Sequence, residues 1–269
     1  MIGAIVGDIV GSIYEFNNIK TKNFDFFHES CFFTDDTVMT IAVGKALQDA
    51  QGHYENLSDL VKESILHLGH MYPDAGYGHR FFRWLFSDKH EPYNSFGNGA
   101  AMRVSACGIV GRNINEVKEL SRKVTDLTHN HPEGIKGAEA TSIAIYLAKN
   151  GKTKEEIREY ISKHYYPLDF TLDEIRKTYS FDGSSQGTVP EALEAFLESG
   201  GYEDAIRNAI SIGGDSDTMA AITGSIAGAF YGIPHDISIR ARKYLDGFLK
   251  SLLTEFENEY PPKIAGNKT

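Results

Sequence analysis

The sequence has little cysteine, no long apolar run and no block of basic residues. Its 269 residues include two cysteines, Cys31 and Cys107, too few for a disulfide-dense secreted fold or for a metal site built from cysteine alone. No apolar stretch approaches the roughly 20 residues that a membrane-spanning helix needs. The apolar N-terminal segment lacks the basic start of a signal peptide and contains Asp8. We therefore expect a soluble, cytoplasmic protein without a membrane partner.

The charge balance is acidic. Lys and Arg number 27 against 37 Asp and Glu, which gives a formal net charge of −10. Without a basic patch to neutralise phosphates, the chain is not expected to bind nucleic acid. Hydrophobic residues at 41% and charged residues at 24% are ordinary for a globular protein and exclude a disordered one.

Helical periodicity dominates the chain, and few segments alternate as strands do. Capping-box spacings, Thr to Glu three residues later, open expected helices over 153–163 and 171–179. We expect further helices over 100–110 and 237–256, and one helix that has Pro190 in its first turn.

No linker, low-complexity tract or solenoid repeat divides the sequence. It therefore predicts a single compact all-α domain over residues 1–260, followed by a loose C-terminal tail at 261–269.

Two sets of glycines are spaced by four residues. They are Gly3, Gly7 and Gly11, and Gly224, Gly228 and Gly232. Because a glycine inside a helix costs about 1 kcal/mol relative to alanine, the pattern predicts two core helices whose backbones approach closely. Such a pair provides a rigid platform for a site.

Two short acidic segments resemble each other, Thr34-Asp35-Asp36-Thr37 and Asp215-Ser216-Asp217-Thr218. Each places two carboxylates and a threonine hydroxyl at the start of an expected helix, so helix capping alone would explain either one. A cap uses one oxygen, however, and the second carboxylate needs a positive partner. No Lys or Arg is adjacent in sequence to either segment.

A divalent cation would supply that positive charge. Carboxylate and hydroxyl oxygens without nearby cysteine favour Mg²⁺ or Mn²⁺ over zinc. If the two segments face each other, they would hold two ions about 3.5–4 Å apart.

Asp8, Ser12 and Glu15 add a polar stripe at helical spacing on the apolar first segment. Either Asp8 caps locally and Glu15 is exposed, or the stripe faces the ions and Glu15 reaches them.

Two further segments have the chemistry of a binding site. The Gly- and Asn-rich turn at 96–103 offers backbone N–H groups suited to a pyrophosphate, although Asn-Gly is also an ordinary turn. In the segment His129-Asn130-His131, zinc binding is disfavoured because a third ligand is absent nearby. A histidine that bonds a substrate or caps the next helix is the better interpretation.

Taken together, these motifs resemble the blocks of the ADP-ribosylglycohydrolases, the ADP-ribosyl-acceptor hydrolases that include dinitrogenase-reductase-activating glycohydrolase. The blocks lie between residues 3 and 232 and read GDIVGSIYE, TDDT, GNGAAMR, HNHPEGIKGA and GGDSDTMAAITGSIAGAFYG. The resemblance implies an all-α fold with two magnesium or manganese ions at the bottom of a cleft.

The resemblance also implies roles for individual residues. The implied metal ligands are Thr34, Asp35, Asp36, Asp215, Asp217 and Thr218. The implied catalytic residues are Glu15, Asp36 and Asp215. The implied substrate-binding residues are Phe96, Gly97, Asn98, Gly99 and His129, with His131 as an alternative to His129.

The activity that the resemblance implies is hydrolysis at the anomeric carbon of an ADP-ribosyl group, on a protein side chain or a small-molecule acceptor. Arginine, serine, a nucleobase and O-acetyl-ADP-ribose stay open as acceptors, and residues 73–95 are a candidate rim. The alternatives are a two-metal phosphoester or nucleotide hydrolase that releases AMP, and a non-catalytic ADP-ribose-binding protein. The complete acidic segments count against the last.

Overall fold

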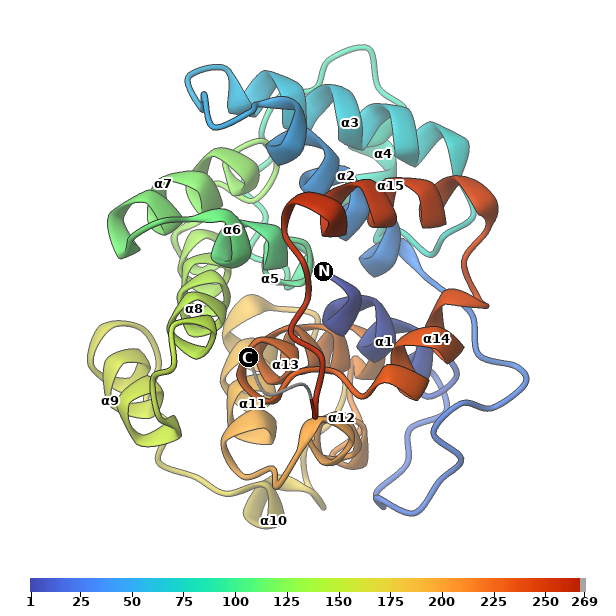
Figure 1. Cartoon of the computed structure of the whole chain (residues 1–269), viewed down its shortest axis with the longest axis vertical. Coiled ribbons are helices and arrows are strands. Elements are labelled where there is room, and N and C mark those ends of the chain that lie inside the picture. The colour runs from blue at the N-terminus through green and yellow to red at the C-terminus, as the bar shows by residue number, and fades with distance from the viewer. Residues whose placement is uncertain (267–269) are drawn as a thin grey trace.

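The computed structural model describes residues 1–266, and the regular elements of that range are helices (Figure 1). In chain order they are α1 (Ile2–Gly11), α2 (Asp35–Asp49), α3 (Leu57–Met71), α4 (His79–Leu85), α5 (Gly99–Met102), α6 (Ser105–Val110), α7 (Ile114–Thr125), α8 (Pro132–Lys149), α9 (Lys154–His164), α10 (Leu172–Ile175), α11 (Ser185–Leu197), α12 (Tyr202–Ser211), α13 (Ser216–Tyr231), α14 (His235–Arg242) and α15 (Gly247–Glu259). The all-α prediction is confirmed. None of the helices in the described range combines the length and apolar character of a membrane span.

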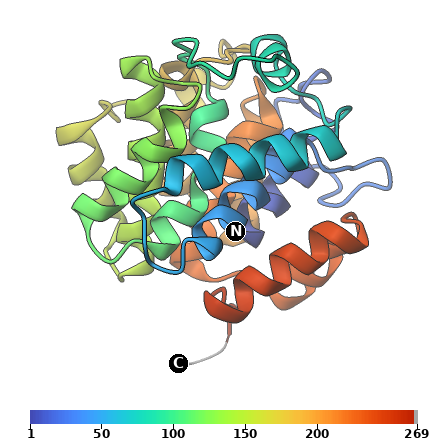
Figure 2. The same ribbon diagram turned by 90° about the horizontal axis from the view of Figure 1, so that it is seen from above.

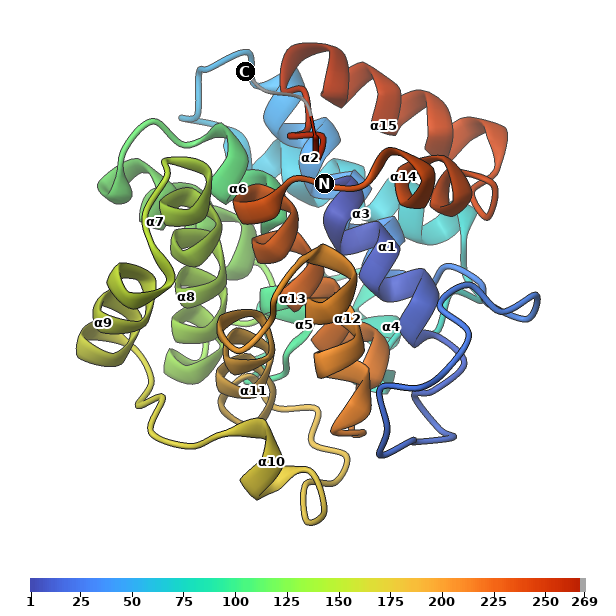
Figure 3. The same cartoon turned by 60° about the horizontal axis from the view of Figure 1, so that its bottom comes forward.

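Helices α1 and α13 lie side by side at the centre of the fold (Figure 3). Every residue of α1 is buried, and so is α13 from Ser216 to Gly228. A Cβ atom added at Gly7 would lie 2.0 Å from the Ala220 carbonyl oxygen, and one at Gly224 would lie 2.3 Å from the Gly3 oxygen. The expected close approach of two backbones is therefore present.

Gly232 does not belong to that contact. It ends α13 with a φ of +80°, the left-handed conformation that glycine adopts without strain. Its surroundings are the C-terminal segment, which pairs with Ile233: the Ile233 N–H donates to the Lys263 oxygen at 2.8 Å, and the Ala265 N–H donates to the Ile233 oxygen at 3.1 Å. The last three residues of the expected tail, 267–269, lie outside the described residues.

The other helices surround the central pair. Helices α8, α11 and α12 pack on α13, whereas α2 and α14 pack on α1. Helices α3 and α15 pack in turn on α2 and cover it (Figure 2). This arrangement leaves the N-terminal ends of α2 and α13, which carry the acidic segments, next to the C-terminal end of α1.

Local capping explains where the expected helices begin. Both capping boxes are present, with the side chains of Thr153 and Thr171 accepting hydrogen bonds from the backbone of Glu156 and Glu174. The helix expected over 171–179 ends at residue 175, and residues 176–178 follow it as a turn in which the N–H groups of residues 178 and 179 both donate to the residue 175 oxygen.

Three other expected boundaries were wrong. The segment 100–110 is divided into α5 and α6, and 237–256 is divided into α14 and α15 because Asp246 caps a new helix through the N–H groups of Phe248 and Leu249. Pro190 lies inside α11, since Ser184 caps that helix well before the proline.

Replacing Gly7 by Ala should destabilise the fold by about 1–3 kcal/mol or more, because the new methyl group overlaps the α13 backbone. Chemical denaturation would measure the change. Gly247→Ala is the matched control, since a Cβ atom at that exposed position meets nothing within 4 Å. Equal stability of the two variants would contradict the close backbone contact.

Candidate active site

The two acidic segments, far apart in sequence, meet at the helix ends. Thr34 caps α2 by accepting the Asp36 N–H at 3.3 Å, and Asp215 precedes the first turn of α13 without a side-chain cap bond. The Thr218 hydroxyl donates to Asp36 Oδ2 at 3.0 Å across a separation of 182 residues. The capping interpretation therefore holds for Thr34 but does not account for the aspartates.

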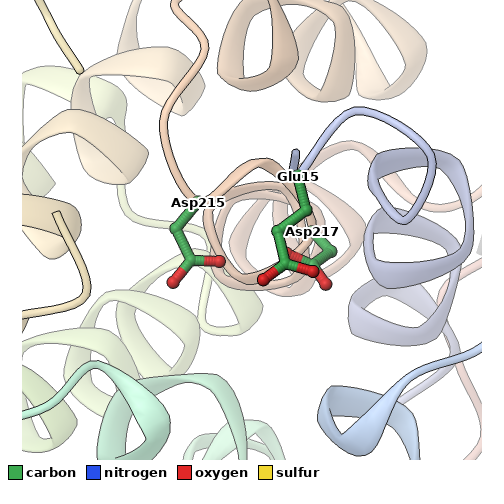
Figure 4. Close-up of side chains that lie close together, drawn as sticks. All are labelled: Glu15, Asp215 and Asp217. Carbon is green, nitrogen blue, oxygen red and sulfur yellow. The ribbon is translucent and has the colours of Figure 1, made fainter. Parts of the chain in front are cut away.

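Glu15 joins this group from the end of α1. That helix ends at Gly11, so Glu15 lies on a following turn and not on the helical stripe that the sequence spacing suggested. Carboxylate oxygens of Glu15, Asp215 and Asp217 all lie within 4.8 Å of one another (Figure 4). Of the two interpretations left open, the one in which Glu15 reaches the acidic segments agrees with this geometry.

Asp8 has a different place, behind the cavity. Its fully buried carboxylate accepts four hydrogen bonds, from the backbone N–H and the hydroxyl of both Thr34 and Thr37. Burial raises the pKa of Asp8 to about 6, while these hydrogen bonds act to lower it. Asp8 thus holds the start of α2 to α1 and does not line the cavity, in contrast to the interpretation in which the whole polar stripe faces a metal site.

A cavity of about 380 Å³ lies in front of the acidic group. Its acidic end is formed by Glu15, Asp35, Asp36, Asp215, Asp217 and Thr218. Thr34 is not among the lining residues, because its hydroxyl donates to Asp8 at 2.7 Å and accepts from Asp36. Glu15 and five of the six predicted metal ligands therefore border one cavity. The sixth predicted ligand, Thr34, lies behind the cavity and bonds to Asp8.

The acidic end concentrates carboxyl groups, none of which forms an ion pair with a lysine or arginine within the described residues. Burial raises the pKa of Asp35, Asp36 and Asp217 well above the ordinary range, and neighbouring carboxylates raise these pKa values further. Burial is also the main reason that the pKa of Glu15 rises to about 7 and that the pKa of Asp215 is raised. Closely spaced ionised carboxylates of this kind need a positive partner.

The donor set fits a hard divalent cation. Asp36 Oδ1 is buried and has no hydrogen-bond partner in the described residues, and a buried carboxylate oxygen without a partner is costly. Six side chains offer oxygen, and neither cysteine is among the residues that line the cavity. Oxygen donors of this kind suit Mg²⁺ or Mn²⁺.

The glycine-rich turn forms the wall next to Asp215. The Asn98 side-chain amide donates to Asp215 Oδ2 at 2.8 Å and to the Thr188 hydroxyl at 3.1 Å, so it is directed to the acidic end. The Asn98 N–H donates to the Gly183 oxygen at 2.9 Å, whereas the N–H of Gly99 makes no hydrogen bond within the described residues. The turn therefore offers a ligand fewer backbone donors than the sequence suggested.

His129 lies beneath this turn and borders the cavity. A Cβ atom at Gly97 or Gly99 would lie 3.5 or 3.4 Å from His129 Nε2, so glycine leaves room above the ring. Burial, followed by the charges of Arg103 and Arg80, holds the His129 pKa well below its ordinary value, and the imidazole is neutral. The alternative residue, His131, instead caps α8 by accepting the Glu133 N–H at 3.1 Å.

The aromatic residue predicted for substrate binding, Phe96, does not line the cavity, whereas Phe81, Tyr93 and Phe181 do. Phe96 is exposed and packs edge-on against His131, with ring centroids 5.5 Å apart, and it is not among the lining residues. Phe181 and Gly183 line the cavity instead, from a loop that hydrogen-bonds to the glycine-rich turn. No periodicity or motif in the sequence marks that loop.

The candidate rim at 73–95 contributes partly to the cavity. Arg80 and Tyr93 line it and contact each other, with the guanidinium 4.9 Å from the Tyr93 ring centre. Trp84, in contrast, is buried in the core, so this part of the rim packs on the body.

The chain is similar in sequence to known proteins. The family model described as ADP-ribosylglycohydrolase matches residues 1–262. ADP-ribosylhydrolase ARH3 of Xenopus tropicalis is 26% identical, with 91% of each chain covered. ADP-ribosylarginine hydrolase Tri1 of Pseudomonas putida is 29% identical over 51% of this chain and 39% of that protein.

A solved structure shares the fold. The chain of an "ADP-ribosylglycohydrolase-related protein complex" superposes with a TM-score of 0.68 at 22% identity, and the match covers 95% of this chain and 94% of the other.

The charge of the acidic end predicts how stability depends on pH without divalent cations. Glu15 has an ordinary pKa of 4.5 and a folded-state pKa of about 7. Between these values the folded state binds more protons than the unfolded state, so this contribution to the free energy of unfolding falls as the pH rises. A bound cation favours the ionised carboxylates and should reverse the loss.

The melting temperature should therefore increase more on adding MgCl₂ at about pH 7.5 than at about pH 5, relative to EDTA. Differential scanning fluorimetry across this range measures the difference. A melting temperature that MgCl₂ and MnCl₂ leave unchanged at every pH would contradict the cation site.

Proposed function

Because this chain belongs to the ADP-ribosylglycohydrolase family, we propose that it hydrolyses the bond at the anomeric carbon of an ADP-ribosyl group and releases ADP-ribose. The observation that carries the proposal is the cavity itself. It brings a cluster of buried carboxylates next to a glycine-rich turn and a neutral histidine. One end suits a cation and a sugar that becomes positively charged, and the other end suits phosphates.

Two divalent cations, Mg²⁺ or Mn²⁺, are part of this proposal. Glu15, Asp35, Asp36, Asp215, Asp217 and Thr218 would hold them. When bound, the cations supply Lewis-acid chemistry at the ribose and neutralise the carboxylates. Thr34 would act through Asp8 and the α2 cap, because its hydroxyl is already engaged.

The protein's own groups would perform the remaining work at the anomeric carbon. As the acceptor leaves, the sugar becomes oxocarbenium-like, and the carboxylates of Asp36 and Asp215 stabilise its positive charge. Glu15 lies beside Asp215 and Asp217 at this end of the cavity, and a carboxyl group so placed can act as a general acid or base. It is the residue that would orient water or protonate the leaving group.

The far end of the cavity would hold the phosphates. The Gly99 N–H and the His129 ring lie beside the same space, together with Gly97 and Asn98. Phe181, which lines the cavity whereas Phe96 does not, would contact the base or ribose of the nucleotide, although both side chains are about half exposed.

The acceptor group would be bound at the rim. The whole substrate would be an ADP-ribosylated protein or a small molecule that contains ADP-ribose. The relatives bear the names ADP-ribosylhydrolase and ADP-ribosylarginine hydrolase, so arginine is one acceptor to test, beside serine and O-acetyl-ADP-ribose.

The first experiment is product analysis. The protein is incubated with ADP-ribosyl-arginine, an ADP-ribosyl-serine peptide or O-acetyl-ADP-ribose, with Mg²⁺, Mn²⁺ or EDTA, and the products are identified by mass spectrometry. We expect free ADP-ribose in the presence of a cation and none with EDTA. Release of AMP would instead establish a phosphoester hydrolase. Binding of ADP-ribose without turnover of any substrate would indicate a non-catalytic binding protein.

Asp217→Asn should lower the turnover rate by at least about 100-fold and should abolish the gain in melting temperature with MgCl₂. The variant removes a carboxylate that lies within reach of both Glu15 and Asp215. Asp59→Asn, on the exposed face of α3, is the matched control and should behave as wild type. Near-normal turnover of Asp217→Asn would refute the assignment of this group.

A further inference from the structure

Arg103 is almost fully buried, borders the cavity and has no carboxylate partner within the described residues. Its side chain is 1% exposed, and it forms no ion pair within the described residues. One guanidinium nitrogen, Nη2, donates to the Thr128 hydroxyl at 2.7 Å and to the Val124 oxygen at 3.2 Å, while Nε has no partner. Burying an unpaired cation costs free energy, so packing alone is a poor reason for its presence.

Thr128 connects Arg103 to His129. The fully buried Thr128 hydroxyl has one proton, and its oxygen lies 2.7 Å from Arg103 Nη2 and 2.7 Å from His129 Nδ1. A guanidinium can only donate, so the hydroxyl must accept the bond from Arg103. Its own proton is then directed to His129 Nδ1, because Thr128 has no other acceptor for it among the described residues.

This chain of bonds determines the tautomer of His129. A neutral imidazole that accepts a hydrogen bond at Nδ1 carries its proton on Nε2. His129 Nε2 lies beneath Gly97 and Gly99, at the edge of the cavity. Its proton therefore points to the space in which the glycine-rich turn would meet a ligand.

The charges around the ring agree with a neutral histidine. The groups that face it are Arg103 and Arg80, whose charges disfavour an imidazolium, and Tyr93, whose ring centre is 6.0 Å away. The charges of Arg103 and Arg80 keep the ring neutral, and the Thr128 hydroxyl occupies Nδ1. The ring can therefore donate a hydrogen bond only from Nε2–H.

We propose that Arg103 and Thr128 are positioning residues that hold the His129 ring as an Nε2–H donor toward a phosphate oxygen of the substrate. The link to a phosphate rests on the proposed function. The tautomer does not, because it follows from the three side chains and their distances alone. Thr128, which does not line the cavity, would thus affect substrate binding only through His129, and neither Thr128 nor Arg103 would take part in the hydrolysis itself.

The tautomer can be measured in the wild-type protein without any substrate. Two-bond ¹H–¹⁵N correlation spectra of the imidazole rings distinguish Nε2–H, Nδ1–H and imidazolium, and His129→Asn assigns the relevant signals. We expect the Nε2–H pattern at neutral pH. A proton on Nδ1, or a charged ring, would overturn the proposal whatever the activity of the protein.

Thr128→Val and Thr128→Ser separate the hydroxyl from the packing. Valine removes the bond to Nδ1 at nearly constant shape, and serine keeps the hydroxyl. Thr128→Val should lose the single Nε2–H pattern and should weaken ADP-ribose binding by about 5- to 10-fold, the value of one hydrogen bond. Its KM should rise by a similar factor with kcat little changed, whereas Thr128→Ser should resemble wild type.

The outcomes distinguish this proposal from the proposed function. Equal losses in the valine and serine variants would overturn the role of the hydroxyl. If wild-type protein neither binds ADP-ribose nor releases it, the proposed function fails, and the spectra still decide whether Arg103 and Thr128 set the tautomer. If Thr128→Val does not fold, the wild-type spectrum and Thr128→Ser keep the proposal open to refutation.

Discussion

The contact on which the site depends is the one between the backbones of α1 and α13. A Cβ atom at Gly11 would lie 2.5 Å from the Cα atom of Asp217, so the end of one helix rests on the beginning of the other. Glu15 follows the first helix by one turn and therefore reaches the carboxylates of the second. A bulkier residue at the contact would separate these groups, because distances of a few ångströms between carboxylates are set here by backbone and not by flexible side chains.

The contact between α1 and α13 also gathers carboxyl groups in a buried place, where ionisation costs the most free energy. Buried carboxylates destabilise a fold unless something positive accompanies them, and within the described residues these groups form no ion pair with a lysine or arginine. Hydrogen bonds relieve the problem for Asp8 and, through Asn98, for one oxygen of Asp215. They leave Asp36 with an oxygen that nothing in the described residues satisfies. The fold gives up stability at this point to keep a reactive arrangement of oxygens.

Much of this arrangement could be predicted from the sequence, for a physical reason. The doubled acidic segments and the glycine spacing are local patterns that conflict with ordinary helix chemistry, and such conflicts are visible without a structure. Residues that act through tertiary contacts left no comparable signal. Phe181 is on an irregular loop, and Arg103 is the last residue of the block GNGAAMR, in which nothing shows that its side chain turns inward to Thr128. Helix ends were missed where a single side chain, such as Asp246, starts a new helix.

The position of Asn98 has a thermodynamic consequence. Its backbone N–H holds the glycine-rich turn to Gly183, and its side chain holds Asp215, so one residue belongs to both ends of the cavity. If a ligand at one end of the cavity changes the affinity of the other end, thermodynamic linkage requires that the ligand at the other end changes the first affinity by the same factor. A nucleotide that orders the turn would thereby tighten the hold on a cation, and the cation would tighten the hold on the nucleotide. For the cation and the nucleotide of the proposed function, binding at the two ends of the cavity would then be cooperative without movement of a helix.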